Sequence, residues 1–351
     1  MRENQMTADA PKQALVTGII VNHNGADYLR EAVVSLLEQE GVSLDVVVVD
    51  NGSTDGSDVA VEAELGARVE VVRLGANRGF GAGNNAAIRR SSSKYVLLLN
   101  NDAVAVAGFA AELVRMAEDD PRIGMVAPKV LDHVTHSVID TVGHLLYPDG
   151  LNRGRGRLER DAGQYDACQE ALFPSGAAAL YRRTMLDEIG LFDEAYFLYG
   201  EDADLGLRGR LAGWRCALAP RAVAYHRYSC TAGAYSTLKA YYVERNRVWV
   251  LARTFPWWLI ILSPAFTLVR LACQAWGAVT GRGAAGRLVR EQSFLAGIGV
   301  AVRATISGFG GLPRILRLRR GDRSFRRLGG LEFLRLLRTY RLPLRDVAFK
   351  E

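Results

Sequence analysis

The segment YFLYGEDADLGLRGRLAGWR at residues 196–215 carries the most reactive pattern in the chain. Two adjacent carboxylates, Glu201 and Asp202, follow a glycine and a group of aromatic residues where we expect a helix to begin. Aromatic neighbours exclude water from a carboxylate, which raises its pKa toward that of a useful general base. Acids also favour the first turn of any helix, where the helix dipole is positive. The segment alone therefore leaves catalysis and simple helix stabilisation open.

Two further acids stand at the ends of apolar, strand-like runs. Asp50 ends LDVVVVD and precedes the polar stretch NGSTDGS, while Asp102 follows YVLLLNN. An acid that emerges from a buried strand can hold Mg²⁺ or Mn²⁺, because these cations take one or two carboxylates together with substrate phosphate oxygens. Turn formation explains such short polar residues equally well. His226, which follows AVAY, is a candidate ligand for the same cation, although a single histidine is more often structural.

A glycine-rich stretch, NRGFGAGNN, occupies residues 77–85. It differs from the dinucleotide-binding fingerprint, because Asn84 stands where the third glycine belongs and the stretch follows the third predicted strand instead of the first. NAD binding is therefore not expected. Glycines at these positions still allow backbone amides to approach a nucleotide closely.

The elements that must position these residues alternate along the first half of the chain. Nearly continuous apolar runs predict strands at 15–21, 44–50, 69–74 and 95–99, and helical patterns lie between them at 26–39, 57–65 and 84–90. This alternation predicts an α/β fold with a largely parallel sheet. Ligands of such sheets bind beyond the carboxyl ends of the strands. Residues 131–175 predict hairpins and a loop, followed by strands at 176–181 and 216–225 around the acidic helix.

The order and spacing of these segments over residues 15–256 resemble glycosyltransferase family 2, and within it the bacterial rhamnosyltransferases of cell-envelope polysaccharide assembly. The matching segments are VNHN at 21–24, VVVDNGSTDGS at 47–57, NRGFGAGNN at 77–85, LLLNNDA at 97–103, SGAAALYRR at 175–183, FDEAYFLYGEDADLGLRGRLAGW at 192–214, AYHRYS at 224–229 and YYVERNRVWVLARTFP at 241–256. The resemblance implies an inverting sugar transferase with the GT-A fold, a Rossmann-like, mostly parallel sheet flanked by helices.

The resemblance also assigns roles. Asp202 would be the catalytic base, beside Glu201, and Asp102, the last position of the family's Asp-x-Asp motif, would bind a divalent metal with His226. Asn100 stands where that motif often has its first Asp, so one metal-facing charge is missing. The expected nucleotide-sugar-binding residues are Asn22, Asn24, Asp50, Asn77, Gly79, Asn84 and Asn101. On the acidic helix, Asp204 lies four residues before Arg208, which predicts a structural ion pair.

Charge is unevenly distributed along the chain. Residues 281–351 hold 16 Lys and Arg against 5 Asp and Glu, whereas residues 1–280 hold 28 against 33. A basic tail predicts an anionic partner. Residues 257–269 form an apolar run of 13, interrupted within by Pro264 and ended by Arg270. Because a membrane span needs about 20 apolar residues, an interfacial helix is favoured over a transmembrane span.

These observations predict a disordered stretch at 1–13, a catalytic domain at 14–235 and a basic, helical, membrane-associating region at 236–351. The resemblance implies dTDP-rhamnose or a UDP-sugar as the donor and a lipid-linked glycan as the acceptor. Four cysteines without metal spacing and the absence of a signal-peptide pattern predict a cytoplasmic protein, peripheral at the inner face of the cell membrane. No nucleic-acid-binding motif accompanies the basic tail. A nucleotidyltransferase and a non-catalytic membrane adaptor remain alternatives.

Overall fold

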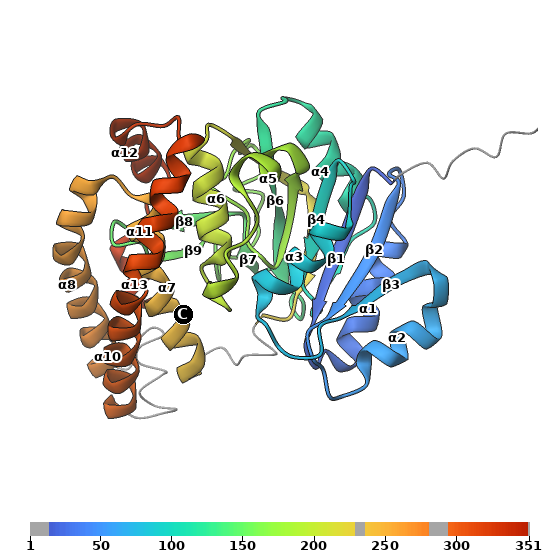
Figure 1. Ribbon diagram of the computed structural model, residues 1–351, viewed down its shortest axis with the longest axis horizontal. Coiled ribbons are helices and arrows are strands. Elements are labelled where there is room, and N and C mark those ends of the chain that lie inside the picture. Colours follow the sequence, from blue (N-terminus) through green and yellow to red (C-terminus); the bar gives the residue numbers. More distant parts are fainter. Residues whose placement is uncertain (1–13, 229–235, 281–293, 350–351) are drawn as a thin grey trace, which may run out of the picture.

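The computed structural model describes residues 14–228, 236–280 and 294–349. Strands and helices alternate through the chain as far as His226. The part from Thr237 onward, which we call the C-terminal half of the fold, is helical (Figure 1). The predicted α/β fold is therefore confirmed. The predicted disorder at 1–13 concerns residues outside the described part of the chain.

Within the described residues, a nine-stranded sheet forms the centre of the predicted catalytic domain, which we call the catalytic half. The strand order is β3-β2-β1-β4-β10-β6-β11-β5, with β7 beside β6. Its strands are β1 (Val16–Asn22), β2 (Leu44–Asp50), β3 (Val69–Arg73), β4 (Tyr95–Leu99), β5 (Ala103–Ala105), β6 (Ile123–Asp132), β7 (Ile139–Thr141), β10 (Ala178–Arg182) and β11 (Arg215–His226). The first four strands of this order run parallel. A separate hairpin pairs β8 (His144–Leu146) with β9 (Asn152–Gly154).

Helices cover the sheet and then form the C-terminal half (Figure 1). They are α1 (Ala26–Leu37), α2 (Ser57–Leu65), α3 (Phe80–Arg90), α4 (Phe109–Glu118), α5 (Arg183–Ile189), α6 (Glu201–Leu211), α7 (Thr237–Thr254), α8 (Trp257–Thr280), α10 (Phe294–Gly310), α11 (Leu312–Gly321), α12 (Gly330–Thr339) and α13 (Leu344–Phe349). The helix predicted at 84–90 begins earlier, at Phe80, because the glycine-rich stretch itself forms its first turn.

The strand register places polar side chains at one edge of the sheet. Asn22 ends β1 directly opposite Asp50, the last residue of β2. On the other side of the sheet, β11 runs antiparallel to β5, so that His226 pairs with Ala103. Because Asp102 precedes Ala103 in the chain, this pairing brings the predicted histidine and acid together.

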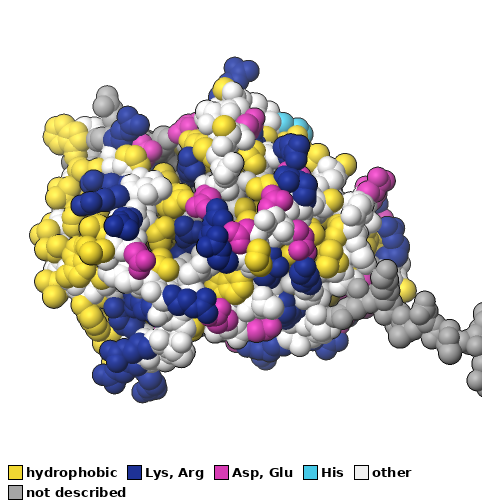
Figure 2. Space-filling model, turned by 90° about the horizontal axis from the view of Figure 1, so that it is seen from above, with side chains coloured by type: hydrophobic (Ala, Val, Ile, Leu, Met, Phe, Trp, Pro, Cys, Tyr) yellow, Lys and Arg dark blue, Asp and Glu magenta, His cyan; other side chains and the backbone are white. Residues whose placement is uncertain are grey.

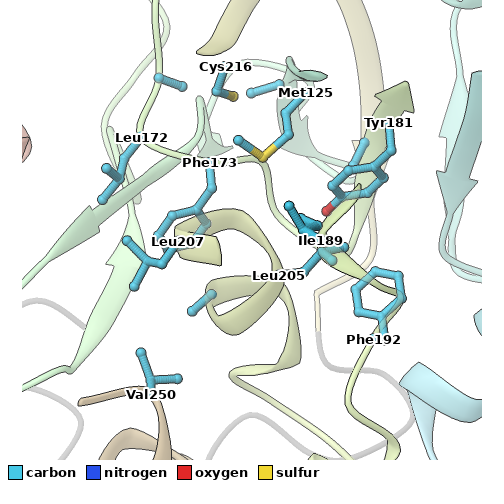
Figure 3. Close-up of a cluster of buried hydrophobic side chains, with 14 of the residues drawn as sticks. Met125, Leu172, Phe173, Tyr181, Ile189, Phe192, Leu205, Leu207, Cys216 and Val250 are labelled. Atoms are coloured by element: carbon cyan, nitrogen blue, oxygen red, sulfur yellow. The ribbon is translucent and has the colours of Figure 1, made fainter. Parts of the chain in front are cut away.

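The catalytic half and the C-terminal helices share one hydrophobic core. Figure 3 shows Val250 of α7 facing Leu205 and Leu207 of α6, below Met125 and Phe173, and all of these side chains belong to one buried cluster. Phe255 and Phe333 extend this cluster, with ring centroids 4.8 Å apart. The predicted boundary at residue 235 is therefore crossed by continuous packing, and its use as a domain boundary stays a prediction.

The C-terminal helices differ in which side they bury. Phe333 and Leu337 of α12 are buried, so this part of the predicted membrane-associating region packs its apolar side chains against the protein. Helix α8 shows the opposite arrangement. Its Arg270 is fully buried, whereas large apolar side chains of α8 and α10 are exposed, namely Trp257, Trp258, Ile261, Leu262, Leu268, Val269, Leu271, Trp276, Ile298, Val302, Ile306 and Phe309. We call these side chains the apolar face; Figure 2 shows yellow surface gathered at the end of the molecule that α8 forms.

Candidate active site

A cavity of about 820 Å³ lies between the carboxyl ends of the strands and the C-terminal helices. The structure brings seven of the predicted site residues to its wall: Asn77, Gly79, Asn101, Asp102, Glu201, Asp202 and His226. Four others, Asn22, Asn24, Asp50 and Asn84, do not line it. The catalytic, metal-binding and nucleotide-binding roles of all these residues stay predictions.

The residues that do not line the cavity hold its strand-end loops in place. Asp50 accepts hydrogen bonds from the backbone N–H groups of Gly52 (3.1 Å) and Ser53 (3.2 Å). The buried amide of Asn22 donates to Ser53 Oγ at 3.0 Å and accepts from Asn101 at 3.0 Å. The Asn24 side chain accepts from the backbone of the same loop at 2.8 Å. These contacts join the loops after β1, β2 and β4 into one rigid edge.

Asn51, to which the sequence reasoning gave no role, ties this edge to the glycine-rich loop. Its side chain donates to Asn77 Oδ1 at 3.1 Å and accepts from the backbone N–H of Arg78 at 2.8 Å. Gly79 has φ of +87°, and an added Cβ would lie 2.3 Å from the carbonyl oxygen of Phe197, so only glycine fits there. Asn84 lies behind this loop within α3, where it donates to the Phe80 carbonyl at 3.0 Å.

The predicted metal ligands meet between β5 and β11. Nε2 of His226 lies 3.2 Å from Asp102 Oδ1, and its Nδ1 lies 2.7 Å from Oδ2 of Asp140 on β7. Burial opposes protonation of the imidazole, but the two flanking carboxylates raise the pKa of His226 to about 10. Burial likewise opposes ionisation of Asp102, yet the neighbouring histidine lowers the pKa of that carboxyl below its usual value.

A divalent cation that substrate phosphates complete would fit here by replacing the proton of His226 Nε2 beside Asp102, because a histidine binds a metal only in its neutral form. Asp102 Oδ1 is buried and receives no hydrogen bond of good geometry among the described residues, although His226 Nε2 lies 3.2 Å away. Asp140 holds the far nitrogen of His226, as carboxylates commonly do behind a metal-binding histidine. The described residues contain no group of three or more His, Cys, Asp or Glu able to hold a metal alone. Two protein ligands match Mg²⁺ or Mn²⁺ bound together with a diphosphate.

The predicted base lies at the start of α6. Asp202 Oδ2 accepts a hydrogen bond from the Gly176 N–H at 3.1 Å, and Oδ1 accepts from the Ala203 N–H at 2.7 Å. Its neighbour Glu201 is buried, and its Oε2 has no hydrogen-bond partner among the described residues. Burial, and then the charge of Asp202, raise the pKa of Glu201 well above the usual carboxyl range. The two carboxylates thus differ in their surroundings. Asp202 accepts two hydrogen bonds at the cavity wall, whereas Glu201 is buried and has a raised pKa.

The loop at residues 196–200, which leads into α6, has a strained backbone that is held by hydrogen bonds from α7. Phe197 and Tyr199 adopt φ of +65° and +64°, values that are unfavourable for side chains of this size. Asn246 of α7 compensates by donating to the carbonyls of Tyr196 (3.0 Å), Leu198 (2.9 Å) and Tyr199 (2.5 Å). A helix from the C-terminal half therefore fixes the position of the loop that carries Glu201 and Asp202.

Two other residues at the cavity wall were missed by sequence reasoning. His144 of β8 lies with Nε2 4.0 Å from Asp202 Oδ2, held by Asn152 (2.9 Å) and stacked on Phe173. Asp140, behind His226, comes from the region predicted only as hairpins and a loop. Neither residue belongs to a local motif. The signal that the sequence offered was a titratable side chain within an irregular region.

The comparison with protein families identifies the chain. Residues 17–190 match the model described as Glycosyl transferase family 2. The chain belongs to this family. The matched residues include the strand-end loops, the glycine-rich loop and Asp102, and the family membership makes the protein a glycosyltransferase.

Relatives and a solved structure agree with this membership. The chain is 27% identical over 263 residues to the N-acetylglucosaminyl-diphospho-decaprenol L-rhamnosyltransferase of Mycobacterium tuberculosis, covering 68% of this chain and 85% of the relative. It is 28% identical over 310 residues to the pre-mycofactocin glycosyltransferase of the same organism, covering 84% and 62% respectively. A mannosyltransferase from Pyrobaculum calidifontis, solved with GDP-mannose and Mn²⁺, superimposes with a TM-score of 0.51 at 18% identity, covering 86% of this chain and 88% of that one. These likenesses establish the GT-A fold.

The raised pKa of Glu201 predicts a pH-dependent stability difference for Glu201→Gln. Below the ordinary glutamate pKa of about 4.3, both the folded and the unfolded wild type are protonated at this position. As pH rises above that value, only the unfolded state releases the proton. The free energy of unfolding of the wild type therefore falls with pH until the raised pKa of Glu201 in the folded state is reached. The variant carries no such proton and should therefore gain stability relative to the wild type across this interval.

Urea unfolding at a series of pH values measures this difference. Glu40→Gln, which removes an exposed carboxyl, is the matched control and should leave the profile parallel to that of the wild type. Parallel profiles for Glu201→Gln as well would contradict the raised pKa.

Proposed function

We propose that this glycosyltransferase moves L-rhamnose, or a related hexose, from a nucleoside diphosphate sugar to a hydroxyl of a lipid-linked cell-envelope glycan, with inversion of configuration. The observation that carries the proposal is one cavity that is lined by both Asp202 and the Asp102–His226 pair. A base and a cation site within one cavity suit a single displacement at an anomeric carbon. The name of the mycobacterial relative supports rhamnose as the sugar and a lipid diphosphate as the acceptor class.

In the proposed reaction, Asp202 takes the proton of the acceptor hydroxyl while that oxygen bonds to the anomeric carbon. The bond between the anomeric carbon and the diphosphate oxygen breaks on the opposite side, and a nucleoside diphosphate leaves. The hydrogen bonds from Gly176 and Ala203 hold the carboxylate of Asp202 in one orientation toward the cavity. His144 lies beside it and would orient the same acceptor hydroxyl.

Asp102 and His226 would hold a divalent cation, Mg²⁺ or Mn²⁺, against the diphosphate. When bound, the cation neutralises the charge that the leaving group develops. Asn51, Asn77 and Gly79 line the cavity and would contact the nucleotide. Asp50 and the buried Asn22 would act on it through the rigid loop edge that they stabilise.

The apolar face supports a location at the inner surface of the cell membrane. Among the described residues, α8 is the one helix long and apolar enough to cross a bilayer, over Trp257–Gly277. However, Arg270 in that helix is fully buried and pairs with Asp149 at 2.7 Å and Glu244 at 2.6 Å. A spanning α8 would break these buried pairs, so we propose that α8 lies in the plane of an anionic membrane surface.

Removing the base tests the chemical step. Asp202→Asn should lower the rate of nucleoside diphosphate release in the presence of acceptor by roughly 10² to 10⁴, the scale of general base catalysis. Donor binding should change little, because the amide keeps the shape of the carboxyl group. Near-normal turnover in this variant would transfer the role to Glu201, and release of pyrophosphate instead of a nucleoside diphosphate would indicate a nucleotidyltransferase.

The cation site is tested by binding measurements without turnover. Asp102→Asn should weaken calorimetric binding of a nucleoside diphosphate in Mn²⁺ but hardly change it in EDTA, because the carboxylate acts through the cation. His226→Gln should behave in the same way. Asp27→Asn, on the exposed side of α1, is the control and should match the wild type in both buffers. Equal weakening of the Asp102 variant in both would mean that Asp102 is only structural.

The membrane orientation is tested by co-sedimentation with vesicles. The wild type should bind anionic vesicles less tightly as salt rises, because the electrostatic attraction is screened. Replacing both Ile261 and Leu268 with Asp should weaken binding by roughly a hundredfold or more, since each large apolar side chain contributes about 1.5–3 kcal/mol when buried. Val134→Asp, which changes an equally exposed side chain in the catalytic half, should have no effect. Undiminished binding of the double variant would reject the apolar face as the contact surface.

A further inference from the structure

The cavity extends well beyond the catalytic acids, along one side of α7. Lys239, Val243 and Arg247 all line it and recur at a spacing of four residues, which places them on one face of the helix. Lys239 marks the catalytic end, because its ammonium group lies 2.7 Å from the hydroxyl of Tyr228, two residues after His226. From there the cavity follows α7 toward α8 and α10.

The far end of the cavity is apolar. Leu271 and Ala275 of α8 line it together with Ile298 and Ala301 of α10. Leu271 is 44% exposed and Ile298 is 47% exposed, so the same side chains line the cavity and form part of the apolar face. The cavity therefore opens onto the apolar face between these two helices.

Buried charges keep this opening apolar. Arg270 turns away from the surface toward Asp149 and Glu244, and Gln274 accepts a hydrogen bond from it at 2.9 Å. The polar side of α8 is thus occupied by contacts with the protein. What remains at the opening are aliphatic side chains from two helices. Along α7 the cavity is lined by Lys239, Glu244 and Arg247, and the last two pair with each other at 3.1 Å.

We propose that the opening between α8 and α10 binds the hydrocarbon chain of the acceptor, an isoprenoid-type chain joined to the acceptor sugar through phosphate. This inference rests on the proposed function and specifies where its acceptor enters. The chain lies against Leu271 and Ile298, its phosphate lies near Lys239, and its sugar reaches Asp202. An acceptor that enters this way keeps its hydrocarbon out of water, which otherwise weakens binding by about fourfold for each exposed methylene.

Photo-crosslinking of the full chain with a short-chain polyprenyl phosphate that carries a diazirine tests the site directly. Labelled peptides should come from α8 around Leu271 and from α10 around Ile298. Ala301→Trp and Ala275→Trp fill the opening from either helix and should each reduce labelling by about tenfold, the effect expected when about two methylenes lose their contacts. Ala272→Trp adds the same ring to an exposed position of α8 that does not line the cavity, and should label normally.

A second readout separates this inference from the proposed function. In the Ala301→Trp and Ala275→Trp variants, sugar transfer to a lipid-linked acceptor should fall while transfer to a lipid-free acceptor is unchanged, which also shows that the variants are folded. Equal labelling of all variants, labelling elsewhere in the chain, or full displacement of the probe by phospholipid vesicles would overturn the lipid site. If the wild type is labelled as expected but transfers no sugar to either acceptor, the lipid site stands and the proposed function fails.

Discussion

Buried ion pairs between the C-terminal helices and the catalytic half hold the cavity together. Arg253 of α7 lies 3.1 Å from Asp204 of α6 and 2.8 Å from Asp322, which follows α11. Arg270 makes the corresponding contact from α8 to Asp149. Removing one partner of such a pair typically costs about 3–5 kcal/mol, because the other charge is left buried and unpaired. Helices α7 and α8 are therefore integral walls of the site, even though they follow the part of the chain that matches the family.

These fixed walls divide the cavity chemically. The sheet side presents amide, carboxylate and imidazole groups from strand-end loops, whereas the side formed by α8 and α10 presents aliphatic groups. A polar wall suits a charged sugar nucleotide, and an apolar wall that reaches the surface suits a lipid. The same helices thus close the cavity and carry the apolar face. In the proposed function, a lipid-linked acceptor and a soluble donor would therefore approach from different directions.

Several residues that were predicted to bind the nucleotide do not reach the cavity, because their side chains hold the strand-end loops in place. The side chains of Asn22 and Asp50 form hydrogen bonds with the neighbouring strand-end loops. These bonds fix the backbone of the loops before any ligand binds. A rigid loop edge loses less conformational entropy on binding than a flexible one. The strained residues Phe197 and Tyr199 follow the same principle, since Asn246 holds them in a conformation that places α6 against the cavity.

The sequence by itself determined the α/β fold, the bounds of β2, β4 and α2, and the ion pair between Asp204 and Arg208, whose groups lie 2.8 Å apart. Each of these depends on neighbours within a few positions, through apolar periodicity or helical spacing. The tertiary structure alone decided that Asp140 stands behind His226, that His144 adjoins Asp202 and that Arg270 points inward. These contacts join residues that are dozens of positions or more apart in the sequence. Which residues meet depends on how the whole chain folds, and no local sequence pattern determines this.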